Sequence, residues 1–557
     1  MARFSSPSRS SRRGVYREPS RLAYQQRQRR PQVRTWTRPV QGVVWTVEVD
    51  WDGDGFGTTP EDDITADFLH RASPTFEFGR DQERSLSPMT SGRGNGEIDN
   101  RSRRYSPDNV DSPLHDRILP ARPFRFQGRL NGVNFTIFRG QFDDYKLRVR
   151  QDQRSVQMSV LDPIAMLKGT SISTRLYSGI RTGEAIGYVL DALGVPEDAR
   201  DLDPGATVIR WWWEHDRDAF SAISDLIESE GPGATLHADE AGRYVFRDRH
   251  HRLLNEASTL PQAFFEPGTD LTPEDMELDL GWRDIINAIS IKVEEREPAK
   301  NVEVVWESED ARSIGSGETI ELTVELNDPL WDPVPGYNYP TLDYVLVAGE
   351  YPVPEIVQMS AQSYKITFSG LFGAGVISNI QMFGQPVEVA RSFQVELADQ
   401  ASIDKYGHRD PVQHKAPWAG VHDAQAIAEL VLGARAERLP TATITLISGT
   451  RESSPLLLQQ LSRNLSDRVH IREPESCVDY GFYLQRIKQR ISDGGMLLTT
   501  DFTLEKAATQ AANVFRFDDA DHGFDRGVFA ATGLDDPQTL FIFDRAGRGF
   551  GDGLFAS

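Results

Sequence analysis

The stretch from Glu97 to Gly169 constrains the fold most, because it alternates short extended segments with stiff polar turns. Its turns are rich in Asp, Asn and Pro: Asp and Asn side chains bond their own backbone, and proline fixes φ. Between the turns, β-branched and aromatic residues recur at Arg122 to Phe126, Thr136 to Phe142 and Ser155 to Val160, as in half-buried strands. This pattern predicts an antiparallel β domain with rigid loops.

The order of the turn motifs is more specific than their composition. An Asp-Asn turn precedes Tyr-Ser-Pro-Asp-Asn, Ser-Pro-Leu, Pro-Ala-Arg-Pro, and Phe-Arg-Gly before an acidic pair. This order closely resembles the N-terminal β domain of tailed-virus tail-tip proteins, the minor tail or baseplate hub proteins of siphophages. A generic proline-rich hairpin surface is the alternative interpretation. The resemblance rests on Asp99, Asn100, Tyr105, Ser106, Pro107, Asp108, Asn109, Ser112, Pro113, Leu114, Arg122, Pro123, Phe138, Arg139, Gly140 and Asp143.

Composition excludes several function classes. No run of about 18 apolar residues is present, so we expect no membrane span, and the N-terminus lacks the apolar segment of a secretory signal. The single cysteine, Cys477, excludes an intramolecular disulfide and a cysteine-based metal cage. The net charge of -22 argues against nucleic-acid binding by the body of the chain.

Residues 1–40 form a basic segment that differs from the rest. It contains eleven arginines and one acid, Glu18. One interpretation is a disordered tail. The other is an Arg-rich arm that lies along acidic neighbouring subunits or contacts DNA in a tail lumen.

An acidic loop follows the strand predicted at Val43 to Val49. Asp50, Asp52, Asp54 and Glu61 match the D-x-D-x-D-G-x5-E spacing of a calcium loop, in which carboxylate oxygens surround the hard cation. The flanks are strand-like rather than helical, however, and Asp-Gly pairs also form ordinary hairpin turns. Ca²⁺ is therefore a candidate cofactor, with a plain turn as the alternative.

Residues 173–283 change to helical spacing and predict a small α/β insertion. Thr182 to Leu193 and Arg217 to Glu230 each carry one apolar face, and Ala234 to Asp248 reads as a hairpin. Trp211-Trp212-Trp213 favours core anchors over a sugar-binding platform. We expect His250 and His251 to point to opposite sides of a strand.

Strand signals dominate again over 284–510, interrupted by one helix near 423–438. Many Pro and Gly residues separate the strands, which predicts a second β domain of the barrel or sandwich type. A Ser-Ile-x-x-Tyr-Gly element before the helix, at Ser402, Ile403, Tyr406 and Gly407, also resembles hub proteins.

The segment 511–557 is a Gly/Phe-rich repeat. VFRFDDADHGFDRGVFA returns as LFIFDRAGRGFGDGLFA, and each copy predicts a hairpin too small to bury its rings alone. We therefore expect these phenylalanines to dock onto the body, each other or a partner. They are Phe515, Phe517, Phe524, Phe529, Phe541, Phe543, Phe550 and Phe555.

The sequence lacks the common catalytic motifs. The sequence has no G-x-S-x-G elbow, Walker loop or H-E-x-x-H helix, so an enzyme is not expected. A calcium-dependent hydrolase would need catalytic residues that no motif supplies.

The predicted fold class is α+β and mainly β: tandem antiparallel β-barrel or sandwich hub domains with a small α/β insertion. The first β domain spans 41–172 and would form the subunit ring. Its expected interface residues, besides the phenylalanines, are Asp99, Asn100, Tyr105, Asp108, Asn109, Arg122, Pro123 and Arg139.

The resemblance implies a virion protein at the tail tip, assembled in the host cytoplasm, that closes the tail tube until genome delivery. It implies a homotrimer that contacts the distal tail protein, the tape-measure protein, and tail fibres or receptor-binding proteins. The alternative from the residues is a carbohydrate-binding adhesin that uses the tryptophans or the Gly/Phe repeat.

Overall fold

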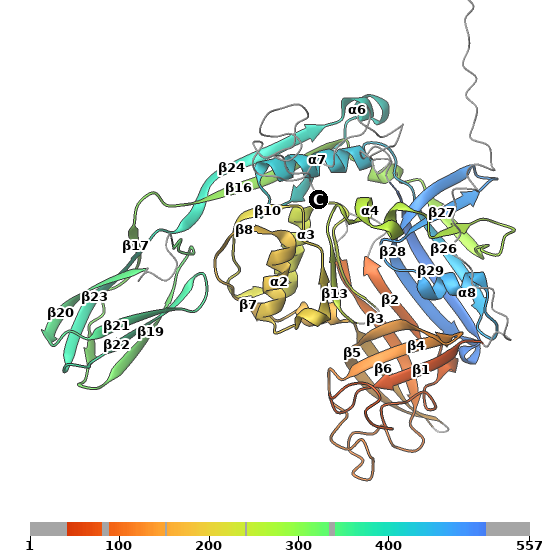
Figure 1. The fold of residues 1–557 in the computed structure, drawn as a ribbon, viewed down its shortest axis with the longest axis horizontal. Coiled ribbons are helices and arrows are strands. Elements are labelled where there is room, and N and C mark those ends of the chain that lie inside the picture. The colour runs from red at the N-terminus through yellow and green to blue at the C-terminus, as the bar shows by residue number, and fades with distance from the viewer. Residues whose placement is uncertain (1–41, 81–88, 151–152, 240–241, 333–339, 508–557) are drawn as a thin grey trace, which may run out of the picture. The chain divides into compact units, whose positions relative to one another are not determined.

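The computed structural model describes residues 42–80, 89–150, 153–239, 242–332 and 340–507 (Figure 1). The predicted arm, 1–40, and the Gly/Phe-rich repeat, 511–557, lie outside the described residues. Within them, strands greatly outnumber helices and most strand pairs are antiparallel. The mainly β, α+β class is therefore confirmed.

One large sheet unites strands from both ends of the described chain. Its main path runs β1-β4-β5-β6-β3-β2-β28-β29-β26-β15, and β14 joins through β27. The central junction is the antiparallel pairing of β2 with β28, from Thr75 opposite Arg490 to Gly79 opposite Arg486; Figure 1 shows these orange and blue strands side by side. The strands are β1 Val44–Val49, β2 Thr75–Arg80, β3 Met89–Asp99, β4 Pro123–Leu130, β5 Val133–Arg150, β6 Gln153–Leu161, β14 Ala263–Phe265, β15 Asp275–Asp279, β26 Thr441–Gly449, β27 Arg468–Glu473, β28 Val478–Ser492 and β29 Leu497–Lys506.

This sheet differs from the predicted division into β domains at 41–172 and 284–510. The strands from β26 onward extend the sheet that begins at β1, while β17 to β23 form separate sheets. Period-two alternation shows which face of a strand is buried, but it carries no information about which distant strand is its neighbour. For that reason the local pattern identified the strands and not their partners.

Two apolar clusters lie against the large sheet. Alternate residues of β4, among them Phe124 and Phe126, are buried with Trp45, Trp51 and Phe76 in the first cluster. The second cluster includes Phe265, Phe482 and Phe502. Both follow the alternation of inward and outward side chains along a strand.

The α/β insertion contains the two predicted helices and the predicted hairpin. Helices α2 and α3 contact each other over a core that includes Ile186, Ile223, Leu226 and Phe246. Asp218 caps α3 by accepting a hydrogen bond from the backbone N–H of Ser221 at 2.9 Å. Its elements are η2 Pro163–Leu167, β7 Ser171–Ile172, β8 Tyr177–Arg181, α2 Thr182–Ala192, η3 Glu197–Ala199, β9 Arg200–Leu202, β10 Val208–Trp212, β11 Arg217–Asp218, α3 Ala219–Glu230, β12 Thr235–Ala238, β13 Tyr244–Arg247, α4 His251–Leu254 and α5 Glu256–Thr259.

The strands β16 and β24 pair to form a long ribbon. In the sequence, a small β-sandwich lies between these two strands. Helix α7 packs on the ribbon strands β16 and β24, with Ile427 and Val431 against Ile289 and Ile291. The sandwich core includes Phe368 and Ile377, from two sheets built around β22 and β23. The elements are β16 Ala288–Pro298, β17 Glu303–Ser308, β18 Arg312–Ile314, β19 Thr319–Glu325, β20 Thr341–Gly349, β21 Val353–Gln358, β22 Ser363–Ser369, β23 Gly375–Gly384, β24 Val387–Ala398, α6 Gln400–Tyr406, β25 Val412–Lys415, α7 Val421–Arg435 and α8 Pro455–Ser462.

Candidate functional site: a polar cavity where three segments meet

The turn segment, residues 99–122, carries most of the residues on which the tail-tip resemblance rests. Asn100 Oδ1 accepts a hydrogen bond from the backbone N–H of Tyr105 at 2.9 Å. The Tyr105 hydroxyl donates to Asp67 Oδ2 at 2.6 Å, and burial, together with this carboxylate, raises the pKa of the phenol. The Tyr145 hydroxyl donates to the Tyr105 carbonyl at 2.8 Å. Because Asn100 and Tyr105 are buried, their side chains hold the turn segment together internally.

The other predicted interface residues of the turn segment lie nearer the surface. Arg101 pairs with Asp99 and lowers the pKa of that carboxyl. Asn109 Nδ2 and Arg122 Nε donate to backbone carbonyls of the turn segment at 3.0 Å and 3.1 Å. Asp108 is exposed and Pro123 begins β4. Their role between subunits stays a prediction, as does that of the phenylalanines from Phe515 to Phe555, which lie outside the described residues.

The acidic loop predicted as a calcium site is closed by its own backbone. Asp50 is buried and accepts hydrogen bonds from the backbone N–H groups of Gly53, Asp54 and Gly55 at 2.6, 3.2 and 3.0 Å. Asp52 instead pairs with Arg117 at 3.1 Å. Two of the four predicted ligands therefore already have partners within the protein.

The remaining two ligands are not brought to a common point. Asp54 Oδ1 accepts a hydrogen bond from the Thr58 hydroxyl at 2.7 Å. The backbone carbonyl of Glu61 accepts a hydrogen bond from Trp51 Nε1 at 3.1 Å. Across the described residues, no group of three or more His, Cys, Asp or Glu side chains is arranged to hold a metal ion. The contacts of Asp50, Asp52 and Asp54 favour the plain-turn interpretation, and calcium binding stays a prediction.

The acidic loop does place Phe56 against two arginines. The guanidinium carbons of Arg125 and Arg139 lie 4.4 Å and 5.2 Å from the centre of its ring, within cation–π range. Arg125 is paired with Glu48 at 2.6 Å. In the described part of the chain, the side chain of Arg139 has no hydrogen bond or ion pair; burial lowers the pKa of its guanidinium, and the charge of Asp239 acts in the opposite direction.

Arg139 lines a cavity of about 500 Å³. Its walls come from β5 of the large sheet, from the β12–β13 hairpin and following helices of the insertion, and from residues Gln460 to Leu465 at and beyond the end of α8. Three segments that are distant in sequence therefore meet at this cavity. Its charged lining residues are Arg139, Arg243, Arg247, Arg463, Asp162, Asp201, Asp239 and Asp467.

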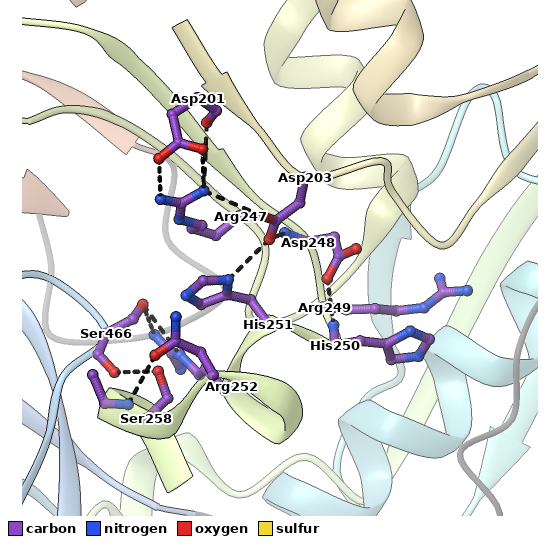
Figure 2. A network of polar contacts seen from close by, with 12 residues as sticks. Asp201, Asp203, Arg247, Asp248, Arg249, His250, His251, Arg252, Ser258 and Ser466 are labelled. Carbon is purple, nitrogen blue, oxygen red and sulfur yellow. Dashed lines mark hydrogen bonds and ion pairs between the residues drawn. The ribbon is translucent and has the colours of Figure 1, made fainter. Parts of the chain in front are cut away.

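One wall of the cavity is a network of paired charges, drawn in Figure 2. Arg247 lies between Asp201 and Asp203, at 2.7 Å and 3.2 Å, and Arg247 is the main cause that lowers the pKa of Asp201. His251 Nδ1 lies 3.0 Å from Asp203 Oδ2. Burial is the largest single influence and by itself raises the pKa of Asp203, but His251, the backbone N–H of Asp248 and the charge of Arg247 together outweigh it, and the pKa is lowered.

The histidine pair does not lie on a strand as predicted. His250 and His251 follow β13, at the start of α4, and in Figure 2 the two rings point to different neighbours. His251 faces Asp203, while burial lowers the pKa of His250. The chain leaves the strand one residue after Arg247 because Asp248 Oδ1 accepts the backbone N–H of His250 at 2.9 Å, a typical turn-forming contact of aspartate.

Behind the cavity wall, Arg249 joins the insertion to α7. Its Nη2 donates to Asp423 Oδ1 at 3.0 Å, and its Nη1 donates to the Glu230 carbonyl at 3.0 Å. The Glu230 carboxylate accepts from the Thr182 hydroxyl at 2.6 Å and from the backbone N–H of Thr207 at 3.0 Å. These buried groups tie α2, α3 and α7 to the end of β13.

A second buried pair lies between α7 and the large sheet. Arg435 of α7 contacts Glu505 of β29, and neither side chain is exposed. Gln485 of β28 donates from Nε2 to Glu505 Oε2 at 2.7 Å, and it accepts from Arg252 at 3.2 Å. Helix α7 is thus bonded both to the insertion and to the large sheet.

The three consecutive tryptophans pack within the protein, as the core interpretation predicts. Trp212 is fully buried. Trp213 meets Trp418 edge to face with ring centres 5.6 Å apart, and Trp211 meets Trp331 at 6.5 Å. These contacts occupy ring surface that a sugar platform would have to offer.

No sequence motif predicted this cavity. The run Arg247 to His251 contains five consecutive polar residues, which marks a polar cluster, but its partners Asp203 and Asp423 are distant in the chain.

Within the described residues, no helix is long and apolar enough to cross a membrane.

No protein-family model and no curated protein matches the chain. Among solved structures, a tail protein of Neisseria meningitidis aligns with 83% of this chain and 96% of its own length, at 11% identity and a TM-score of 0.43. The 43 kDa tail protein of prophage MuSo2 from Shewanella oneidensis aligns with 84% of this chain and 99% of its own length, at 11% identity and a TM-score of 0.43.

A third matched structure comes from Escherichia coli. It is described as a type VI secretion system component with structural similarity to the bacteriophage T4 tail proteins gp27 and gp5. It aligns with 86% of this chain and 78% of its own length, at 9% identity and a TM-score of 0.34.

Proposed function

We propose that this chain is a non-enzymatic structural protein of a virus tail, and that it serves as a hub at the tail tip or baseplate. The observation that carries the proposal is the turn segment. The residues on which the sequence resemblance rests, above all Asn100 and Tyr105, act together to hold one β domain in shape. The resemblance is therefore one of architecture, which suits a protein whose work is mechanical.

The connectivity supports the same role. β2 pairs from Thr75 to Gly79 with the Arg486 to Arg490 part of β28, so strands near both ends of the described chain lie in one sheet. A force that separates these strands along their axes must shear several backbone hydrogen bonds together, and the buried contacts of α7 add further links. This arrangement suits a subunit that transmits force between neighbours.

In this proposal the protein assembles as a homotrimer and closes the tail tube. It contacts the distal tail protein, the tape-measure protein, and fibres or receptor-binding proteins, and it opens for genome delivery. The basic arm would face neighbouring subunits or DNA, and the Phe-rich repeat would reach a partner. Assembly would take place in the host cytoplasm.

The mass of the full-length protein in solution, measured by light scattering, tests the assembly. A mass of three chains is the expected result, alone or after mixing with the distal tail protein. Gold-labelled antibodies against this chain should mark the tail tip of intact virions. Labelling of the capsid, or virions that lack the chain altogether, would overturn the proposal.

A further inference from the structure

We propose that two free strand edges of the large sheet, one on β5 and one on β15, bind each other between copies of this chain. The partner is thus a second copy, joined by strand addition. The inference rests on the proposed function, because three such contacts would close the proposed homotrimer. It concerns which surfaces meet, so it can fail while the role in the tail stands.

The outer half of β5 extends beyond the strand that covers its first half. β4 pairs with β5 only as far as Gln141, which lies opposite Pro123. From Asp144 to Arg150, β6 is the one strand of the described residues that pairs with β5, and a bulge just after Phe142 bends the strand there. The other edge of this half therefore presents backbone N–H and C=O groups that none of the described strands covers.

The same half of β5 carries exposed apolar side chains. Leu147 is 48% exposed and Val149 is 76% exposed. Leu147 lies opposite Val156 of β6, which is fully buried in the first apolar cluster, so Leu147 and Val149 project from the core-facing side of the sheet. A valine this exposed gains apolar burial when another strand is added beside it.

Basic side chains occupy the opposite face of this half. Lys146, Arg148 and Arg150 follow one another at every second position, and all three are exposed. Lys146 contacts Asp144, whereas Arg148 and Arg150 form no ion pair with any residue that the structure describes. The free edge therefore carries positive charge near the β5–β6 turn.

β15 offers the opposite charge at the same spacing. It ends the sheet order and pairs only with β26 among the described strands. Met276 and Leu278 pack against the second apolar cluster, and the residues that alternate with them are exposed acids. These acids are Asp275, Glu277 and Asp279. Asp275 and Asp279 each accept one nearby backbone N–H at 2.9 Å, but none of the three forms an ion pair within the described ranges.

A pairing centred on Arg148 and Glu277 matches both patterns. Because the charges recur at every second residue on each strand, all three basic side chains lie opposite acids whether the strands run parallel or antiparallel. The apolar side chains of both strands then share the other face, which faces the apolar cores. The added strand would cover Val149 and use the free backbone groups of both edges.

The charges also determine which edges can meet. Charged side chains on an edge strand protect a sheet from aggregation, and here like charges oppose contact of β5 with β5 or of β15 with β15. The favourable contact joins β5 of one copy to β15 of the next. Since β6, β3, β2, β28, β29 and β26 separate these strands in the sheet order, the contact is head-to-tail, the type that closes into a ring.

Light scattering of the full-length protein over a series of concentrations tests the proposal with charge reversals. Reversal on either strand alone places like charges opposite each other and should weaken association by at least about tenfold. Reversal on both strands restores opposite charges and should restore association. The β5 variant carries Lys146→Glu, Arg148→Glu and Arg150→Glu; the β15 variant carries Asp275→Arg, Glu277→Arg and Asp279→Arg; the combined variant carries all six.

A third reversal is the matched control. Glu303→Arg, Glu307→Arg and Glu355→Arg change the net charge as the β15 variant does, at exposed positions of the sandwich, and should leave association unchanged. Circular dichroism verifies folding. The pairing is wrong if both single-strand variants associate normally, if a folded combined variant stays dissociated, or if the unchanged protein is monomeric at every concentration. Variants that remain trimeric but lose the distal tail protein would also overturn it, and would assign the edges to that partner.

A disulfide tests the contact even where a reversal fails to fold. Opposite residues of paired strands have Cβ atoms about 4.5–5.5 Å apart, so a small adjustment allows a bridge. In a Cys477→Ser background, which removes the exposed native thiol, Arg148→Cys with Glu277→Cys should give covalent trimers on mild oxidation, and either substitution alone should not. A folded double-cysteine chain that does not cross-link would overturn the pairing. Gold labelling of the tail tip tests the proposed function separately.

Discussion

The guanidinium of Arg249 lies 3.0 Å from the carboxylate of Asp423, and the two side chains are 1% and 3% exposed. One residue follows a strand of the α/β insertion and the other lies in the first turn of α7, 174 positions later. Such a pair is stable in the interior only when both charges remain matched. It therefore makes the docking of α7 and the folding of the insertion depend on each other.

Removal of one partner should destabilise the protein strongly. Arg249→Met removes the guanidinium that bonds Asp423 Oδ1 and the Glu230 carbonyl, and we expect a loss of about 3–5 kcal/mol in the free energy of unfolding. The double variant Arg249→Met with Asp423→Leu should recover part of that loss, because it removes the Asp423 carboxylate together with the guanidinium that this carboxylate bonds. Urea unfolding followed by tryptophan fluorescence measures both.

The exposed pair of Lys405 and Glu437 provides the control. Lys405→Met should leave the urea midpoint unchanged, because solvent screens an exposed pair. The interpretation of Arg249 fails if Arg249→Met is equally harmless, or if the double variant is less stable than both single variants.

Two tyrosines of the first β domain allow a matched comparison. Tyr105→Phe removes the hydrogen bond to the Asp67 carboxylate, at 2.6 Å, and should cost about 1.5–3 kcal/mol, as bonds to charged groups do. Tyr145→Phe removes a bond to a neutral carbonyl, at 2.8 Å, and should cost about 0.5–1.5 kcal/mol. Thermal unfolding of both variants gives the order, and a larger loss for Tyr145→Phe would contradict the role assigned to Asp67.

Elements whose signals are local could be predicted from the sequence. The apolar spacing of Thr182 to Leu193 and of Arg217 to Glu230 indicated α2 and α3, and the Asp239 to Gly242 turn indicated the β12–β13 hairpin. In each case the periodicity or the cap lies within a few residues of the element it specifies. Such signals need no knowledge of the rest of the chain.

The cavity could not be predicted in the same way. Its wall combines Arg139, Arg247 and Gln460, which no spacing rule relates. The acidic loop shows the opposite difficulty: its spacing fits a calcium motif, but the backbone N–H groups after Asp50 bond that carboxylate, and calcium binding stays a prediction. An aspartate that closes its own turn and one that binds a cation have the same sequence pattern.

The acidic loop gives a direct test of these two interpretations. Asp50→Ala removes the acceptor for three backbone N–H groups and should cost about 1–3 kcal/mol, whereas Glu61→Gln should change little because only the Glu61 carbonyl bonds Trp51. Calcium or a chelator should leave the thermal midpoint of the protein unchanged. A midpoint that rises with calcium, and no longer rises in Glu61→Gln, would instead establish a calcium site.

Asp162 should make stability depend on pH in a defined window. It is 3% exposed, and burial raises its pKa from 3.8 to about 7. Between these two values the folded state binds more protons at this residue than the unfolded state does. Stability contributed by this group therefore falls as the pH rises from about 4 to about 7, and the full cost is present above that range.

Asp162→Asn isolates this dependence. Asn keeps one acceptor for the backbone N–H groups of Gly92 and Ile164, so the variant carries an offset that does not change with pH. The unfolding free energy of the unchanged protein minus that of the variant should decrease steadily from about pH 4 to about pH 7. Urea unfolding at several pH values measures the difference, and Asp108→Asn, at an exposed position, reports the effect of removing a surface carboxyl. A difference that stays constant or increases over this range would show that Asp162 is charged in the folded protein throughout.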